Sequence, residues 1–191
     1  MTLQATVLGR KLRACDLDDL PHEWDTRYEL VGGVLFVSRR PSVEHQETIA
    51  NLVWALLAPV KALGGKVLPE PGVLWEEDGD DNVSPDVVVM LPDRLAIVQA
   101  KKIRGAPHLV VEVLSPGPEA ARRDLEAKRG LYWRRGVDEY WIVDPEARTL
   151  RRMTRGAADW DEERLSEDAV VCTPLLPAWP GVAVAELLPP R

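Results

Sequence analysis

Cysteine and phenylalanine are scarce in this chain, and long apolar runs are absent. The only two cysteines among its 191 residues are Cys15 and Cys172, and they match no metal-ligand spacing. Two such cysteines predict free thiols and not a disulfide. No run approaches the roughly 18 apolar residues of a membrane span, and the first residues lack the basic and apolar blocks of a signal peptide. We therefore expect a cytosolic protein that does not bind membranes.

The sequence also lacks an internal repeat, a low-complexity tract and a phosphate-binding glycine loop, which excludes repeat architectures and argues against an organic nucleotide cofactor. What it does contain, 46% hydrophobic and 29% charged residues, is enough to bury a core. We expect a single domain over residues 1–191 with its core at about 16–188. The proline-rich tail, residues 174–191, is expected to lie extended over the body or over a neighbouring subunit.

The formal net charge of −7 argues against a nucleic-acid enzyme, because phosphate contacts need basic surface. The charge is nevertheless uneven. Acids concentrate at 76–81 and 159–168, whereas 101–104 and 122–135 supply local positive charge. A nuclease also carries acidic residues because it binds metal. We expect modest affinity of the isolated chain for DNA, with a homodimer or another partner completing the cleft.

Glu112 is the first candidate site residue. It lies in the apolar run 107–114, Pro-His-Leu-Val-Val-Glu-Val-Leu, which is typical of a strand buried on both faces. A carboxylate stays ionised in such a place only when it is paired, hydrogen-bonded or bound to a metal. Glu112 therefore predicts partners elsewhere in the chain.

Asp86 is the first such partner. It opens a second apolar run, 85–90, after the acidic and loop-like stretch 76–82. The proline before this β-branched run marks the start of a strand, where its missing N–H breaks no ladder bond. We therefore expect Asp86 and Glu112 at the ends of neighbouring strands.

Lys128 lies on the helix expected after Glu112. At 100° per residue, an arc of roughly 120° forms the inward face of that helix. The members of this arc are Ala121, Asp124, Leu125, Lys128, Leu131 and Tyr132. An ammonium in the middle of an inward face needs a carboxylate. The sequence thus predicts a pocket in which Lys128 meets Asp86 and Glu112.

This combination of residues suits metal-assisted phosphodiester hydrolysis. Mg²⁺, or Mn²⁺ in its place, binds through one or two carboxylates together with phosphate oxygens, and can activate water. The lysine would then orient or deprotonate the water, or stabilise charge in the transition state. A structural alternative stays open, in which the three residues only tie the helix to the sheet.

The same residues carry a resemblance to a known family. Pro85-Asp86 followed by Glu112-Val113-Leu114 resembles the PD-(D/E)XK signature of restriction-endonuclease-like nucleases. The wider pattern, from about Asp16 to Leu188, is similar to the Uma-type branch of that superfamily. The stretches that carry it are Tyr28–Gly33, Ser42–His45, Glu112–Pro116, Asp124, Lys128, Tyr132 and Gly136–Pro145.

The resemblance implies an α/β (α+β) fold: a restriction-endonuclease-like central mixed β-sheet flanked by helices, with an N-terminal β-hairpin. It implies that Asp86, Glu112 and the carbonyl of Val113 hold the metal. Ser115, Asp124 and Tyr132 belong to the matching stretches and are expected to line the cleft. One departure is that Leu114 stands where the signature has its lysine. Either Lys128 replaces that lysine from the helix, as in the Uma-type branch, or the enzyme is impaired.

Two further residues complete the candidate site. Glu29 lies on an expected hairpin, 27–31 returning as 34–38 around Gly32-Gly33, a connection suited to a primed turn. The resemblance implies a metal-ligand or water-ligand role for Glu29, and the alternative is a solvated edge-strand charge. His45 begins an amphipathic helix capped by Ser42 and lies on its buried side. It is either a structural histidine or, as the resemblance implies, a residue near the cleft and its DNA.

Two functions therefore remain open. The first is a Mg²⁺-dependent endonuclease acting on DNA through Asp86, Glu112 and Lys128, with Glu29 assisting. The second is a non-catalytic module of nuclease ancestry that binds nucleic acid or a protein. Strandedness, base preference and biological role are not encoded in any recognisable pattern.

Overall fold

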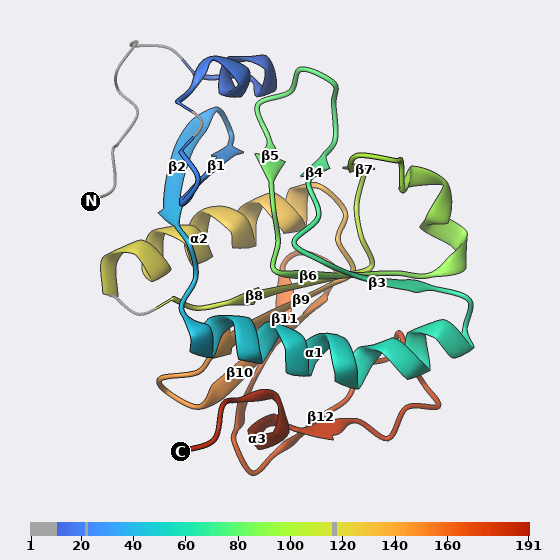
Figure 1. The fold of residues 1–191 in the computed structure, drawn as a ribbon. Helices are drawn as coiled ribbons and strands as arrows, with labels where there is room; N and C mark the ends of the chain where they lie inside the picture. The colour runs from blue at the N-terminus through green and yellow to red at the C-terminus, as the bar shows by residue number, and fades with distance from the viewer. Residues whose placement is uncertain (1–10, 22, 116–117) are drawn as a thin grey trace.

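The computed structural model describes residues 11–21, 23–115 and 118–191, and the side chains of 118–125 lie outside the description. It is a mixed α+β protein in which helices flank mixed sheets, as the sequence predicts (Figure 1). The α-helices are α1 (Val43–Ala62), α2 (Pro118–Arg134) and α3 (Val184–Leu187), and 3-10 helices span η1 (Ala14–Asp19) and η2 (Pro92–Ile97). The strands are β1 (Thr26–Val31), β2 (Val34–Arg39), β3 (Lys66–Pro69), β4 (Val73–Leu74), β5 (Asn82–Val83), β6 (Val87–Met90), β7 (Ile103–Arg104), β8 (Leu109–Val113), β9 (Glu139–Asp144), β10 (Thr149–Arg155), β11 (Trp160–Ser166), β12 (Val170–Val171) and β13 (Val182–Ala183).

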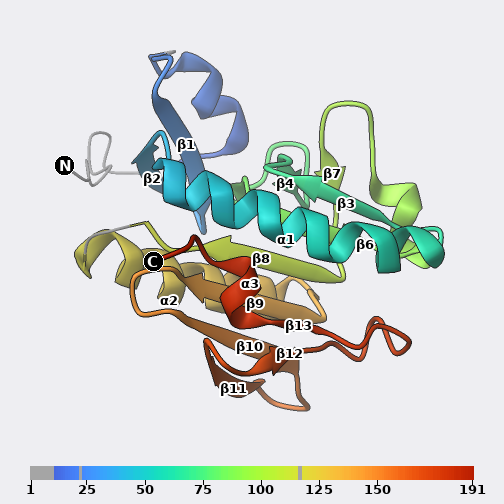
Figure 2. The ribbon, with the colours of Figure 1, turned by 60° about the horizontal axis from the view of Figure 1, so that its bottom comes forward.

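The central sheet has six strands in the order β11-β10-β9-β8-β6-β3. Only β8 and β9 run parallel in it, and α2 makes the crossover between them. The other neighbours are antiparallel. Helix α1 covers one face and α2 the other (Figures 1 and 2). Side chains of β6 and β8 alternate between these two layers because successive strand residues point to opposite faces.

The N-terminal hairpin forms as the sequence predicts. β1 and β2 pair with Val31 opposite Val34, so Gly32 and Gly33 alone make the turn. Their φ angles of 57° and 76° belong to the left-handed region that a primed two-residue turn needs and that glycine adopts without strain. The hairpin joins a second sheet, ordered β2-β1-β5-β4-β7, which brings β1 over the N-terminal side of the central sheet.

Helix α1 begins as predicted, with Ser42 as its N-cap. The Ser42 side chain accepts a hydrogen bond from the His45 backbone N–H, which satisfies a donor of the first turn. Ile49, Leu52, Leu56 and Val60 then face the core at helical spacing. This cap and apolar stripe fix the first turn of α1, and with it His45, at one end of the sheet.

The C-terminal tail differs from the expected extended segment. Residues 182–183 pair with β12, and α3 packs against α1 through Val184, Leu187 and Leu188 (Figure 2). These three side chains are buried, so the tail completes the core on the α1 face. The two cysteines, Cys15 and Cys172, are free thiols, as predicted. Within the described residues, no helix has the length and apolar character that crossing a membrane requires.

Candidate functional site

Asp86 and Glu112 lie at the same end of the central sheet. β6 and β8 are antiparallel with Val87 opposite Val111, so the residue before β6 stands beside the last residues of β8. The Oδ2 atom of Asp86 accepts a hydrogen bond of 2.7 Å from the Val113 N–H. The buried Asp86 side chain therefore fastens the start of one strand to the end of the next, as the two apolar runs predict.

Lys128 reaches this end of the sheet from α2. Its Nζ atom lies 3.0 Å from Glu29 Oε2 and 3.1 Å from Glu112 Oε1, and the side chain is almost fully buried. Leu131 and Tyr132 are buried on the same helix face, which confirms the inward face computed from the sequence. Leu114, at the place of the signature lysine, is partly buried among apolar residues. The ammonium of the site thus comes from α2 and not from β8.

Tyr132 is the second α2 residue in the site. Its hydroxyl donates a hydrogen bond of 2.7 Å to Glu112 Oε1, the same oxygen that Lys128 approaches. Both side chains are buried, so Tyr132 lies beneath the carboxylate and does not line an open cleft. It orients Glu112 toward Lys128.

Glu29 belongs to the buried site and is not a solvated edge-strand charge. Its side chain is almost fully buried, with Oε1 accepting 2.7 Å from the Ser84 N–H and Oε2 accepting from Lys128. The tight turn at Gly32-Gly33 and the pairing of Leu30 with Asn82 hold β1 against the segment before β6. Glu29 and Glu112 therefore hold the ammonium of Lys128 between them.

His45 meets the site from α1. Its Nε2 atom is 3.0 Å from the Val113 carbonyl oxygen and 3.3 Å from Asp86 Oδ2. Because both of these partners are acceptors, Nε2 carries the proton. Its Nδ1 atom is buried and has no hydrogen-bond partner in the structure. The ring is buried and turned toward Asp86, so His45 is adjacent to the site without facing solvent.

Burial and charge move the two acids in opposite directions. Burial raises the pKa of Asp86, but the hydrogen bond and charge of His45, with the Val113 N–H, outweigh it and hold that pKa below its ordinary value. Burial raises the pKa of Glu112 to about 8, with Lys128 opposing the rise and Asp86 and Glu29 adding to it. Glu112 is thus a carboxyl whose ionised form lacks enough positive charge around it.

Arg27 and Glu70 also belong to the site, although the sequence patterns do not single them out. The guanidinium of Arg27 lies 3.6 Å from Asp86 Oδ1 and pairs with the Glu70 carboxylate. Its strand parity with Glu29 is the signal that could have found it, because residues two apart on a strand share a face. Glu70 follows β3 and has no comparable signal.

The remaining predicted residues are placed less centrally. Ser115 lies just beyond β8 and is exposed, and the side chain of Asp124 lies outside the described residues. His108 shares strand parity with Glu112, but its Nδ1 accepts from the Leu91 N–H and its Nε2 meets the Asp93 carboxylate. His108 therefore anchors the loop before η2 at the other end of β8.

The oxygens gathered here have the chemistry that Mg²⁺ and Mn²⁺ prefer. Asp86 and Glu112 offer carboxylates and Val113 a carbonyl, and the raised pKa of Glu112 marks a place where added positive charge would be favourable. In the part of the chain that the structure describes, no three side chains of His, Cys, Asp or Glu are grouped to hold a metal ion by themselves. A cation would therefore need the carbonyl, water or substrate oxygens as further ligands, as is usual for Mg²⁺.

The fold and these residues define a nuclease-like class of protein. A crystal structure titled as a putative nuclease belonging to DUF820, from Anabaena variabilis, superposes with a TM-score of 0.74 at 19% identity and covers 92% of this chain and 97% of its own. The sequence model of the Uma2 family, described as "Putative restriction endonuclease", matches residues 15–185. The chain belongs to this family. No curated protein matches it.

Proposed function

We propose that this protein is a metal-dependent endonuclease that hydrolyses phosphodiester bonds of DNA. The observation that carries the proposal is one ammonium, Lys128, held 3.0 and 3.1 Å from two buried carboxylates at the sheet end where Asp86 also lies. Membership of the Uma2 family supports hydrolysis of nucleic acid as the reaction. The metal, the DNA substrate and the residue roles are parts of the proposal.

Asp86, Glu112 and the Val113 carbonyl would hold Mg²⁺ or Mn²⁺. When bound, the ion would polarise the phosphodiester and lower the pKa of a water molecule. The carbonyl of Val113 is 3.0 Å from His45 Nε2, so His45 sets the direction of this oxygen through its hydrogen bond. His45 thereby acts through Val113 and Asp86, as a positioning residue.

Lys128 is the group proposed to act on the reacting atoms. Its ammonium is fixed by Glu29 and Glu112, so no reorganisation is needed when negative charge develops on the phosphate. Glu29, fixed in turn by the Ser84 N–H, assists by keeping that ammonium charged and in place. Tyr132 stabilises the ionised form of Glu112 through its hydroxyl.

DNA as the substrate must be reconciled with the net charge of −7. A phosphate backbone binds basic surface, so we propose that a second copy of the chain supplies part of it in a homodimer. Affinity would then depend on protein concentration.

The second candidate function is a non-catalytic binding module that keeps these residues as a folding core. The observation in its favour is that Lys128, Glu29, Glu112 and Asp86 all have protein partners in the structure. In this case the network ties α2 and β1 to the central sheet, and no metal enters.

Cleavage of supercoiled plasmid and of single-stranded DNA tests the first proposal. Wild type with Mg²⁺ or Mn²⁺ should cut, whereas Asp86→Asn and Lys128→Ala, each shown to be folded by circular dichroism, should lose ~100-fold or more of the rate. A matched control is Glu126→Gln, an exposed carboxylate on α2, which should cut like wild type. Folded wild type that cuts neither substrate with either metal would favour the binding module.

A further inference from the structure

Arg27 stands at the mouth of the site with its positive charge divided among three acceptors. Its Nη1 atom lies 3.6 Å from Asp86 Oδ1 and donates to the Ser84 carbonyl at 3.3 Å, and its Nη2 atom pairs with Glu70. The Arg27 side chain is 29% exposed, whereas that of Asp86 is 4% exposed. Among the site's cations described above, Arg27 reaches solvent and Lys128 does not.

This arrangement fits recognition of a phosphate. A guanidinium presents parallel N–H donors that match phosphate oxygens, and it does not lose its proton. Burial lowers the pKa of Arg27, but the charges of Asp86, Glu29 and Glu70 outweigh it and hold that pKa above its ordinary value. Ser84 and Asp86 would keep the guanidinium in place if Glu70 were removed, which leaves the Nη2 side for another anion.

Glu70 is held beside Arg27 by a backbone that is costly for a non-glycine residue. Its φ angle is 47°, in the left-handed region, and its N–H donates 2.9 Å to the Asp86 carbonyl oxygen. The Glu70 side chain is 36% exposed, so its carboxylate can leave Arg27 for water. Glu70 is therefore tied through its backbone to a proposed metal ligand, with its side chain on the solvent side.

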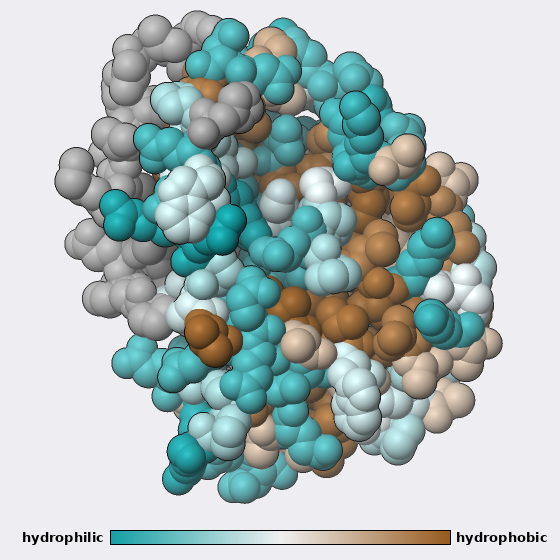
Figure 3. Space-filling view, in the orientation of Figure 1, coloured by the Kyte–Doolittle hydropathy of each residue, from teal (hydrophilic) through white to brown (hydrophobic). Residues whose placement is uncertain are grey.

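We propose that Arg27 binds a phosphate of the substrate strand beside the reacting phosphodiester, and that Glu70 occupies that place in the free protein. The inference rests on the proposed function and extends it to substrate binding. The Glu70 carboxylate is replaced by a phosphate oxygen when DNA enters, so the protein disfavours binding until this ion pair is broken. The hydrophilic surface around the hairpin end contrasts with the apolar area on the far side of the same face (Figure 3).

The test is binding of a fluorescein-labelled DNA duplex, measured by anisotropy in EDTA so that no metal-dependent cleavage takes place. Glu70→Gln should bind about threefold to tenfold more tightly, because Arg27 is released and a repelling charge is lost. The slope of log affinity against log salt should steepen by ~0.9, the value for one more phosphate contact. Arg27→Gln should bind more weakly, with a slope shallower by the same amount.

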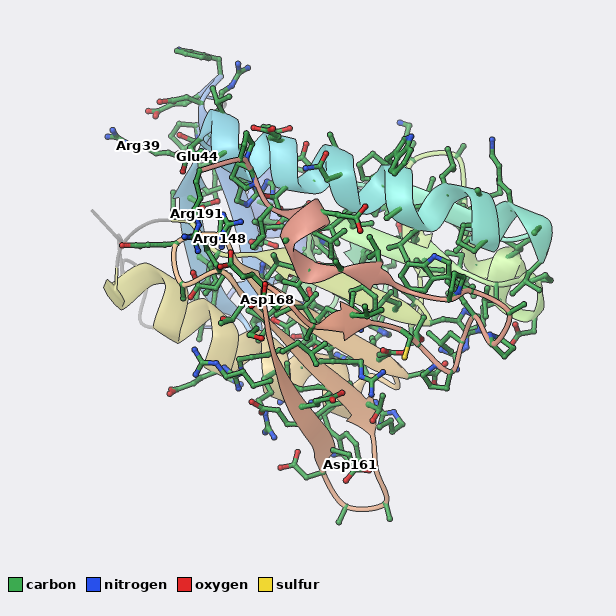
Figure 4. All side chains as sticks on the ribbon, turned by 90° about the horizontal axis from the view of Figure 1, so that it is seen from below. Arg39, Glu44, Arg148, Asp161, Asp168 and Arg191 are labelled. Carbon is green, nitrogen blue, oxygen red and sulfur yellow. The ribbon has the colours of Figure 1, made fainter. Side chains whose placement is uncertain are left out.

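A matched control comes from the ion pair of Arg151 and Glu162, whose side chains are 31% and 35% exposed, close to the 29% and 36% of Arg27 and Glu70. It lies on the β10–β11 hairpin, whose end carries Asp161 and projects away from α1 and from Arg39 on β2 (Figure 4). Glu162→Gln should change neither affinity nor slope.

Arg27→Lys is a second variant in case Arg27→Gln does not fold. It keeps the charge and loses the paired donors, so its affinity should fall while its slope stays near that of wild type. Unchanged affinity and slope in both Glu70→Gln and folded Arg27→Gln would overturn the inference. If the wild type still cuts plasmid in that case, the nuclease proposal stands without it. Failure of the wild type to cut or to bind would remove both.

Discussion

The raised pKa of Glu112 predicts a stability that falls as the pH rises in the absence of metal. The folded protein keeps a proton on Glu112 up to about pH 8, whereas an unfolded glutamate loses it near 4.5. Between these values the folded state binds more protons than the unfolded state, so the free energy of unfolding decreases with pH. At ~1.36 kcal/mol per pH unit, the loss attributable to Glu112 amounts to about 5 kcal/mol at most.

Urea unfolding in EDTA at intervals from pH 5 to 8 measures this effect. Wild type should lose stability over the range, and Glu112→Gln, which has no proton to lose, should show a much flatter profile. Glu139, another buried acid whose pKa is raised by burial, leaves some slope in both proteins. Glu126→Gln should follow wild type, since that carboxylate is exposed. Parallel profiles for wild type and Glu112→Gln would refute the reasoning.

Three substitutions give further predictions, all measurable by urea unfolding. Lys128→Met should cost about 3–5 kcal/mol at pH 8, because it leaves Glu29 and Glu112 buried without their ammonium; a cost below 1 kcal/mol would contradict the buried ion pair. Tyr132→Phe should cost about 1–2 kcal/mol and move the Glu112-dependent loss to higher pH, since the Tyr132 hydroxyl lowers the pKa of Glu112; an unmoved profile would speak against that hydrogen bond. Gly33→Ala should cost more than ~1 kcal/mol, because φ is 76° and the new Cβ would lie 2.7 Å from Lys11 Cβ, whereas Gly72→Ala, whose Cβ meets nothing nearer than 3.8 Å, serves as its control.

The sequence predicted the central residues of the site because each breaks a local rule. Glu112 is a charge inside a buried strand, and Lys128 is a charge on the inward face of a helix, so both require partners. Helical periodicity placed Lys128 correctly, and strand order followed from the two apolar runs. The structure brings these residues together as expected, and their catalytic roles stay predictions.

Arg27 and Glu70 were missed because their partnership depends on tertiary structure. Arg27 is an ordinary charge on a hairpin strand, and only the approach of β1 to the segment before β6 brings it to Asp86. Glu70 adopts a left-handed backbone that no glycine or asparagine announces. Such positions are set by long-range packing and not by the local pattern.

Two segments of the fold were also not foreseen. β11 is rich in acids, so its sequence resembles a solvated loop, yet ion pairs such as Arg151 with Glu162 stabilise it as an edge strand. In the tail, prolines favour an extended chain, but Val184, Leu187 and Leu188 have helical spacing and bury themselves against α1. Packing of a few apolar side chains outweighs the composition of the tail.

The measurement that tests the central claim most directly is a calorimetric titration of the folded protein with Mn²⁺ at pH 8, where Glu112 releases its proton most easily. If the buried carboxylates form a metal site, wild type binds the ion, Asp86→Asn and Glu112→Gln lose binding, and Glu126→Gln keeps it. If wild type takes up no ion, or if Asp86→Asn binds it as wild type does, the network of Asp86, Glu112 and Lys128 is an ion-paired core and the metal-dependent nuclease account is wrong.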